Sequence, residues 1–114
     1  MSINLNREET WPLYSSDRIA QLMGSGILTF QSDKGNFQKF FSDREIVYYS
    51  DVNDLAEKVL YYHAHDDERR AIAAAGRAKY HKLFSGERTI RFMVETLTNT
   101  PYSEDYEWAD EVYR

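Results

Sequence analysis

The apolar positions in the first half of the chain predict three short strands. Residues 3–6 (Ile-Asn-Leu-Asn) place apolar side chains at alternate positions, which is the period of a strand. Residues 27–30 (Ile-Leu-Thr-Phe) are almost continuously apolar, which is typical of a strand buried on both faces. Residues 45–49 (Glu-Ile-Val-Tyr-Tyr) combine β-branched and aromatic side chains, so they form the clearest of the three predicted strands.

Polar and glycine-containing segments separate these strands. Residues 7–14 include a proline and predict a loop, after which Ser15 or Ser16 is placed to cap a short helix. Gly24 and Gly26 end this helix, because glycine tolerates the left-handed conformation found at helix C-termini. Residues 31–36 predict a second loop, and residues 37–41 a single helical turn.

From Asp51 onward the apolar period becomes helical. Asp51 and Asp54 stand at the N-cap and N3 positions of the first helix, as in a carboxylate variant of the capping box. The residues at helical spacing that follow are Val52, Leu55, Ala56, Val59, Leu60 and His63. A second helix begins at Asp66 or Asp67. Its apolar side is Ile72, Gly76, Tyr80, Leu83 and Phe84, and the glycine in mid-helix predicts a close approach by a neighbouring segment.

Ser85 is placed to cap a third helix in this half of the chain. Its apolar residues recur at i, i+3, i+4 and i+7, namely Ile90, Met93, Val94 and Leu97. Pro101 then ends the helical pattern, and the remaining residues are acidic and aromatic, with one possible helical face at Tyr102, Tyr106, Ala109 and Tyr113. This tail is equally compatible with a docking helix and with a frayed terminus.

The order of elements predicts an α/β fold with a three-stranded parallel sheet and flanking helices. A sheet of three parallel strands has two open edges and little area to bury. We therefore interpret the chain as half of a doubly wound, Rossmann-like domain, or as a domain that self-associates. The predicted boundaries are residues 1–100 for this half-domain and residues 101–114 for the acidic aromatic tail.

Composition removes several classes of function. The chain has 114 residues, a net charge of -5 and no cysteine, so cysteine-based zinc sites and disulfide frameworks are excluded. It has no basic stripe, which argues against a nucleic-acid partner. No window approaches the length of a membrane span, and the first residues do not resemble a signal peptide. We therefore expect a cytoplasmic protein.

The short helix before the second strand carries the candidate chemistry. Its N-terminal amides are expected at the carboxyl edge of the sheet, where α/β proteins bind ligands and where helix ends attract phosphate. Arg18 would pair with a diphosphate, and Gln21, one turn later, would reach a ribose hydroxyl. The same residues also fit an ordinary solvated crossover helix, and the residues alone leave both interpretations open.

No catalytic or metal constellation is apparent in the sequence. His63 and His65 are two positions apart on a helix and face different directions, and His81 has no acidic pair to complete a ligand set. Neither a serine-histidine-acid set nor a phosphate-binding loop is present. We predict no catalytic residue, no metal and no cofactor in this chain.

Five motifs in order resemble the C-terminal half of the nucleotide-sugar-binding domain of GT-B glycosyltransferases, of the CgeB-like and group 1 type. The first two lie in the run from Arg18 to Thr29, namely a helical pattern that begins with an arginine and ends at a glycine, and the buried strand behind it. Residues 45–49 match the next strand, residues 54–58 (Asp-Leu-Ala-Glu-Lys) a helix, and residues 68–77 (Glu-Arg-Arg-Ala-Ile-Ala-Ala-Ala-Gly-Arg) another. The likeness covers about residues 3 to 98.

The resemblance implies a site for the nucleotide part of a UDP- or GDP-linked sugar donor. The positions it assigns are Asn6, Ser16, Arg18, Gln21 and Thr29. The acidic residue with which the family holds the ribose falls on Gln21, an uncharged acceptor, and the earlier glutamate of the related pattern falls on Leu13. The family's catalytic base lies on an N-terminal domain, so the resemblance implies no complete transferase activity for this chain alone and a partner that is that domain or a second copy.

An alternative from another class is a small non-catalytic α/β interaction domain. Such a domain would self-associate through an open edge of its sheet or through the acidic tail.

Overall fold

The chain divides into two compact units, Met1–Tyr80 and His81–Arg114. The computed structural model describes residues 1–5, 12–13 and 17–111. In this part of the chain no helix has the length and apolar character needed to cross a membrane. The division at residue 100 that the sequence suggests stays a prediction.

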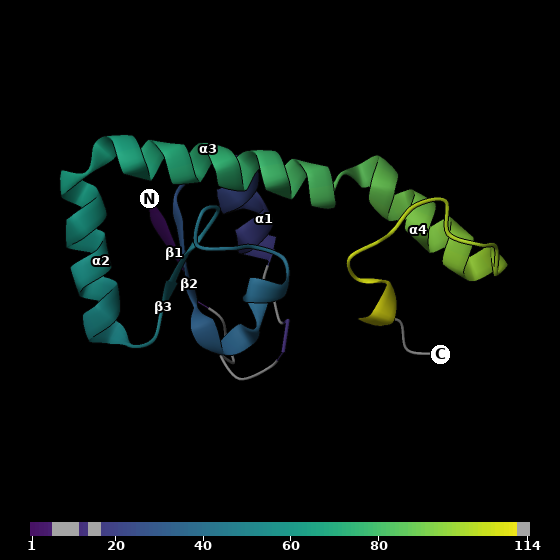
Figure 1. Cartoon of the computed structure of the whole chain (residues 1–114), viewed down its shortest axis with the longest axis horizontal. Helices are drawn as coiled ribbons and strands as arrows, with labels where there is room; N and C mark the ends of the chain where they lie inside the picture. The colour runs from purple at the N-terminus through teal and green to yellow at the C-terminus, as the bar shows by residue number, and fades with distance from the viewer. Residues whose placement is uncertain (6–11, 14–16, 112–114) are drawn as a thin grey trace. The chain divides into compact units, whose positions relative to one another are not determined.

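The first unit is built on a three-stranded parallel sheet in the order β1-β2-β3 (Figure 1). The strands are β1 (Ser2–Asn4), β2 (Thr29–Ser32) and β3 (Val47–Tyr49). In the register, Ile3 lies beside Phe30, and Phe30 beside Val47. This arrangement confirms the predicted α/β class and agrees with half of a Rossmann-like domain.

The strand bounds differ from those predicted. The second strand lies two residues later than predicted, because Gln31 and Ser32 continue the ladder instead of opening a loop. The prediction of a loop over residues 31–36 was therefore wrong at its first two positions, and the 3-10 helix η1 (Asp33–Gly35) begins only after them. The predicted helical turn is the 3-10 helix η2 (Phe37–Lys39). In the third strand, Glu45 and Ile46 belong to the preceding turn.

Helices cover the two faces of the sheet. On one face, the side chains of Phe30 and Val47 form a buried core, against which Leu55, Val59 and Tyr62 of α2 (Val52–Ala64) pack. On the other side of the sheet lies α1 (Asp17–Gly24), which buries Ile19 and Met23 (Figure 1). The helices therefore close both faces of the central strand β2.

The predicted helix ends are confirmed wherever the structure describes them. Oδ1 of Asp51 accepts hydrogen bonds from the amides of Asn53 and Asp54, so the predicted carboxylate cap is present. Asp54 accepts in turn from the amide of Ser50, the residue before the N-cap, instead of from the N-cap amide itself. After α1, Gly26 adopts a left-handed φ of 76°. Its amide and that of Ile27 bond back to carbonyls of the helix's last turn, which closes that end.

Gly76 lies where α3 (Asp66–Leu83) crosses the turn before β3. A Cβ atom built on Gly76 would stand 2.3 Å from the carbonyl oxygen of Glu45 and 3.3 Å from the terminal methyl of Met23. The first of these is a backbone atom, which cannot rotate away. The close approach predicted from the mid-helix glycine is thus confirmed, and the absence of a side chain is what permits it.

Part of the predicted apolar stripes is not buried in the structure. On α2, Val52 and Leu60 are 78% and 70% exposed. On α4 (Gly86–Thr98), all four residues of the predicted stripe are more than half exposed: Ile90, Met93, Val94 and Leu97. The 3.6-residue period identified these helices correctly, but the faces that pack are set by other residues.

The second unit consists of the end of α3, helix α4 and the segment that follows it. Ser85 caps α4 as predicted, since its hydroxyl accepts from the amide of Arg88 at 3.2 Å. Asn99 ends the helix in the left-handed conformation. Between the helix and the 3-10 helix η3 (Ala109–Glu111), the chain is irregular.

Arg88 holds this segment together. Its guanidinium forms ion pairs with Glu104 and Glu107, both at 2.7 Å, and also donates to the carbonyl of Asp105 at 2.8 Å. The same group lies 4.9 Å from the ring centre of Trp108. Burial by itself would lower the pKa of Arg88, but its two carboxylate partners outweigh that effect and raise it. One α4 side chain thus fixes the segment through both charge and ring contacts.

Aromatic rings and one carboxylate complete the attachment to α4. Phe92 contacts Tyr102, Tyr106 and Trp108 at centroid distances of 5.3, 5.0 and 5.8 Å. Glu95 accepts hydrogen bonds from the amide of Ser103 and from the hydroxyl of Tyr106. These bonds hold the pKa of Glu95 below its ordinary value.

We expect Gly76→Ala to lower the free energy of unfolding by about 2 kcal/mol. Overpacking costs about 1–3 kcal/mol or more, against a helix-propensity gain of about 1 kcal/mol. Gly86→Ala is the matched control, because no described atom lies within 4 Å of a Cβ built there. Urea denaturation of the variants and the parent chain measures both effects. Equal stability of the two variants would contradict the close contact at Gly76.

We expect the segment after α4 to detach from that helix as the pH falls below about 4.5, the ordinary value for glutamate. Hydrogen bonds from Ser103 lower the pKa of Glu95. For Glu107, burial raises the pKa, but the bond from Arg88 outweighs it. A lowered pKa in the folded state stabilises the contact above the ordinary value, and this stabilisation is lost as the pH falls through the lowered value.

Trp108 fluorescence in a Trp11→Phe background reports this detachment. In the further variant Glu95→Gln the change of emission with pH should be smaller, because one of the two titrating carboxylates is gone. Emission that stays constant from pH 7 to the acid unfolding of the whole chain would contradict the prediction.

Candidate functional site

The carboxyl edge of the sheet brings together the segments that follow the three strands. Because the strands are parallel, Leu5 after β1, Asp33 after β2 and Ser50 after β3 all lie at this edge. Ligands of open α/β sheets bind outside this edge. It is therefore the candidate site.

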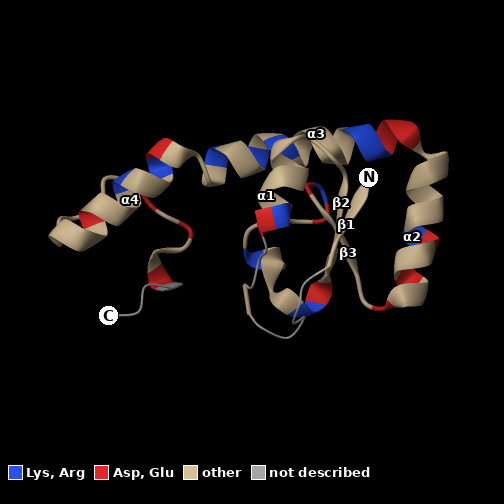
Figure 2. Cartoon of the chain, turned by 180° about the vertical axis from the view of Figure 1, so that it is seen from behind, with Lys and Arg blue, Asp and Glu red and all other residues tan. Residues whose placement is uncertain are grey.

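Arg18 reaches this edge. Its Nη1 atom donates to the carbonyl oxygen of Leu5 at 3.0 Å, which ties the first turn of α1 to the end of β1. Arg18 and Gln21 are both exposed and stand three positions apart on α1, so they are neighbours on its surface. Asp17 precedes them, and the start of α1 carries adjacent negative and positive segments (Figure 2). The negative charge of Asp17 is stabilised by the positive end of the helix dipole, and a phosphate bound at the same end would compete with it.

Thr29 lies at the opposite edge. It begins β2, where it pairs with Ser2, and its side chain is buried. Its hydroxyl donates to the carbonyl of Ile27 at 3.0 Å. The structure therefore brings Arg18 and Gln21 together but places Thr29 at the amino edge of the sheet. Asn6 and Ser16 lie outside the described residues.

A buried amide pair lies under the carboxyl edge. The Nδ2 atom of Asn4 donates to Oε1 of Gln31 at 2.6 Å, and both residues are almost fully buried. Among the described residues, Nε2 of Gln31 is buried without a hydrogen-bond partner. A buried donor without a partner costs free energy, so each of these two buried amides needs a hydrogen-bond partner, which an apolar pair would not.

This pair is not predicted from the sequence, which places Gln31 in a loop and Asn4 in a strand without a partner. The sequence does carry a signal for it, because Asn4 lies within one apolar strand pattern and Gln31 directly follows another. The register then places Asn4, Gln31 and Tyr48 side by side on one face.

The turn after β2 presents backbone rather than side-chain chemistry. Ser32 caps η1, Gly35 is buried in it, and the carbonyl of Gly35 accepts from the amide of Leu13 at 2.8 Å. Asn36 follows with a left-handed φ of 57°. This compact turn fixes the path of the chain directly beyond the buried amide pair.

Lys58 contacts the outer edge of β3. Nζ of Lys58 donates to the backbone carbonyl of Tyr48 at 2.7 Å and forms an ion pair with Asp54 at 2.8 Å. A small cavity of about 210 Å³ lies beside it, lined by Asp43, Ile46, Val47, Tyr48, Lys58 and Tyr62. Burial raises the pKa of the Tyr48 hydroxyl, which donates to the carbonyl of Phe41 at 2.7 Å. These polar groups therefore bond to partners within the protein, and the bond from Lys58 covers a carbonyl of the edge strand β3.

The groups at the carboxyl edge are suited to a ligand that carries both an anionic group and hydroxyl groups. Arg18 supplies a permanent positive charge with donors in a planar fork, and Gln21 supplies an amide that both donates and accepts. Within the described part of the chain, no three histidine, aspartate or glutamate side chains gather as a metal ligand set would.

Residues 1–95 match the family described as glycosyl transferase-like. Because this match covers most of the 114 residues, the chain belongs to the glycosyl transferase-like family. The predicted resemblance to group 1 glycosyltransferases is thereby confirmed. Searches among curated proteins and among solved structures returned no significant match.

Proposed function

We propose that this chain forms the nucleotide-sugar donor-binding half of a GT-B type glycosyltransferase. Its membership in the glycosyl transferase-like family supports a sugar donor as the ligand. The observation that carries the proposal is the position of Arg18, whose guanidinium lies at the end of β1 on the carbonyl of Leu5. The proposed site is thus the carboxyl edge beside β1 and β2.

In this site Arg18 pairs with the diphosphate of a UDP- or GDP-linked sugar. A guanidinium has five N–H donors, so the bond to Leu5 leaves others for phosphate oxygens. Gln21, on the same surface of α1, accepts a hydrogen bond from a ribose hydroxyl. Asn6 and Ser16 belong to the proposal through the family resemblance. Thr29 is left out of it, because its hydroxyl is buried and bonded at the other edge.

The reaction itself is proposed to need a second domain. The groups of this edge bind charge and hydroxyls, whereas glycosyl transfer also needs a base for the acceptor. We therefore propose that acceptor and base are supplied by a partner domain and that the chain alone transfers no sugar. Arg18 offsets one of the two negative charges of the diphosphate, and the proposal includes no resident metal or cofactor.

Nucleotide titration tests the site. We expect UDP or GDP, and their sugars, to shift the amide signals of residues around Arg18 and Gln21 in two-dimensional NMR spectra. Arg18→Gln should weaken this binding about tenfold, because hydrogen bonds to charged groups contribute about 1.5–3 kcal/mol. The matched control is Arg44→Gln, an exposed arginine in the turn before β3, hence at the amino edge.

Equal weakening by the two arginine variants would mean that net charge alone attracts the nucleotide, against the proposed site. No response to any nucleotide or nucleotide sugar would favour the alternative function, a non-catalytic interaction domain.

We expect Gln21→Glu to tighten nucleotide binding severalfold, because a charged acceptor forms a stronger hydrogen bond with a ribose hydroxyl than an amide does. The gain should disappear with 2′,3′-dideoxy-UDP, which lacks the hydroxyls to be held. Isothermal titration calorimetry with both nucleotides measures the difference. A gain that persists with the dideoxy nucleotide, or a loss with both, would show that Gln21 does not contact the ribose.

A further inference from the structure

The carbonyl oxygen of Leu5, which accepts the hydrogen bond from Arg18, lies just beyond the paired part of the sheet. The register of β1 with β2 ends one residue earlier, at the pair of Asn4 and Gln31. Leu5 follows at the end of an edge strand, and its side chain is 61% exposed. Neither strand pairing nor burial of its own side chain therefore fixes the position of this carbonyl.

The side chain of Asn4 connects this end of β1 to the centre of the sheet. Asn4 directly precedes Leu5 and is 1% exposed, and its Nδ2 atom donates to Oε1 of Gln31 at 2.6 Å. Gln31 is fully buried in β2, the central strand, whose four residues are all buried. The hydrogen bond between the two amides thus ties the residue before Leu5 to a part of the chain that close packing holds in place.

The contribution of this pair to stability does not account for it. Nε2 of Gln31 is buried without a hydrogen-bond partner among the described residues. The η1 turn covers this atom, since a Cβ atom built on Gly35 would stand 3.9 Å from Nε2. A buried polar pair with one donor left unpaired stabilises a protein less than an apolar pair of the same size does. What the pair adds is a directional bond, which fixes where the end of β1 lies.

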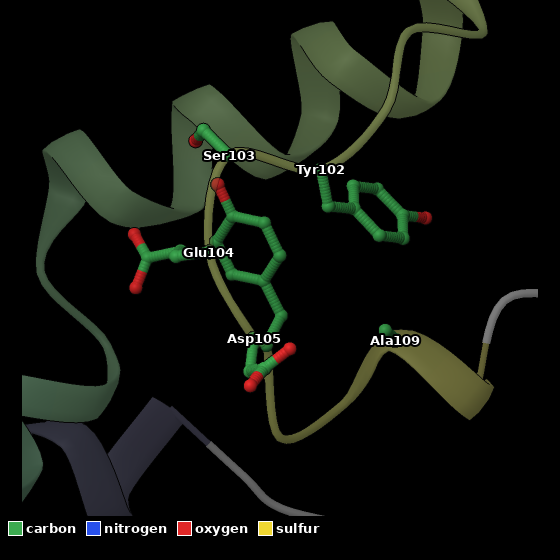
Figure 3. Close-up of a pocket in the computed structure, with 6 residues that line it drawn as sticks. Tyr102, Ser103, Glu104, Asp105 and Ala109 are labelled. Atoms are coloured by element: carbon green, nitrogen blue, oxygen red, sulfur yellow. The ribbon is translucent and has the colours of Figure 1, made fainter.

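Buried polar groups of the second unit, by contrast, are bonded to α4. The hydroxyl of Tyr106, a residue only 5% exposed, donates to Glu95 at 3.0 Å. The carboxylate of Glu104 (Figure 3) pairs with Arg88 at 2.7 Å. These groups satisfy one another. Within the described part of the chain, Gln31 is thus the residue whose buried side chain keeps an unpaired polar atom, and it lies under the proposed donor site.

We propose that Gln31 is a positioning residue of the proposed donor site and acts through Asn4. The bond between the two amides fixes the end of β1, and the Leu5 carbonyl at that end then holds the Arg18 guanidinium in place before a diphosphate arrives. Such preorganisation improves binding because the side chain is already ordered. The consequence for the ligand rests on the proposed function, whereas the coupling within the protein does not.

The order of the Arg18 side chain measures this coupling without any ligand. In the full chain, 15N relaxation gives the order parameter of its Nε–H group. We expect a higher value than for Arg44, an exposed arginine whose guanidinium has no partner among the described residues. Gln31→Met removes the acceptor of Asn4, so the Arg18 value should fall to that of Arg44. If this variant does not fold, Asn4→Leu combined with Gln31→Met takes its place, because both amides of the pair are then absent.

Two control variants separate this coupling from a general loss of stability. Gln31→Glu keeps an acceptor oxygen for Asn4, so it should keep the order of Arg18 even though a buried carboxyl group lowers stability. Phe30→Leu leaves a cavity on the opposite face of the same strand and should keep the order of Arg18 as well. An Arg18 order parameter that is no higher than that of Arg44 in the parent chain, stays unchanged in Gln31→Met, or falls equally in either control would overturn the proposal.

Nucleotide affinity tests the consequence for the donor site. Gln31→Met should weaken the binding of UDP or GDP about threefold, since the Arg18 side chain must then be ordered when the nucleotide binds. In an Arg18→Gln background the same change should have no effect, because its target is gone. Equal weakening in the two backgrounds would count against the positioning role. A parent chain that binds no nucleotide would contradict the proposed function, and the order parameters would then decide the positioning role by themselves.

Discussion

The first unit depends on the burial of one short strand, β2, on both faces. All four of its residues are buried, and Phe30 and Gln31 have no exposed surface. Phe30 requires an apolar cover, which α2 and α3 supply, whereas Gln31 requires a polar partner, which Asn4 supplies from β1. The central strand thus determines what stands on each side of it. The turn that follows it leads to the carboxyl edge where the candidate site lies.

Close contact and charge hold the elements that surround this strand. α3 approaches the turn before β3 because Gly76 has no side chain, and the outer carbonyl of β3 is taken by Lys58. In the second unit the corresponding role belongs to Arg88, which joins α4 to the acidic segment. The match to the glycosyl transferase-like family covers residues 1–95, so the segment that Arg88 holds lies outside the matched residues.

Much of the fold could be predicted because it rests on local chemistry. The capping residues Asp51 and Ser85, the stop at Gly26 and the close approach at Gly76 each depend on one residue and its near neighbours. The parallel direction of the strands followed from the alternation of strands and helices. Of the predicted site residues, Arg18 and Gln21 share the surface of α1, whereas Thr29 lies at the other edge of the sheet, since strand polarity and register are fixed only by pairing.

The sequence by itself determined the α/β class, the helix ends and the family, because these follow from periodicity, capping chemistry and ordered motifs. Tertiary structure alone decided where polar groups meet. The pairing of Asn4 with Gln31 joins residues 27 positions apart, and that of Arg88 with Glu104 joins residues 16 positions apart. It also decided which helix faces are covered, leaving Leu60 and Leu97 exposed despite their apolar spacing. Such outcomes depend on packing between distant segments, which no local pattern encodes.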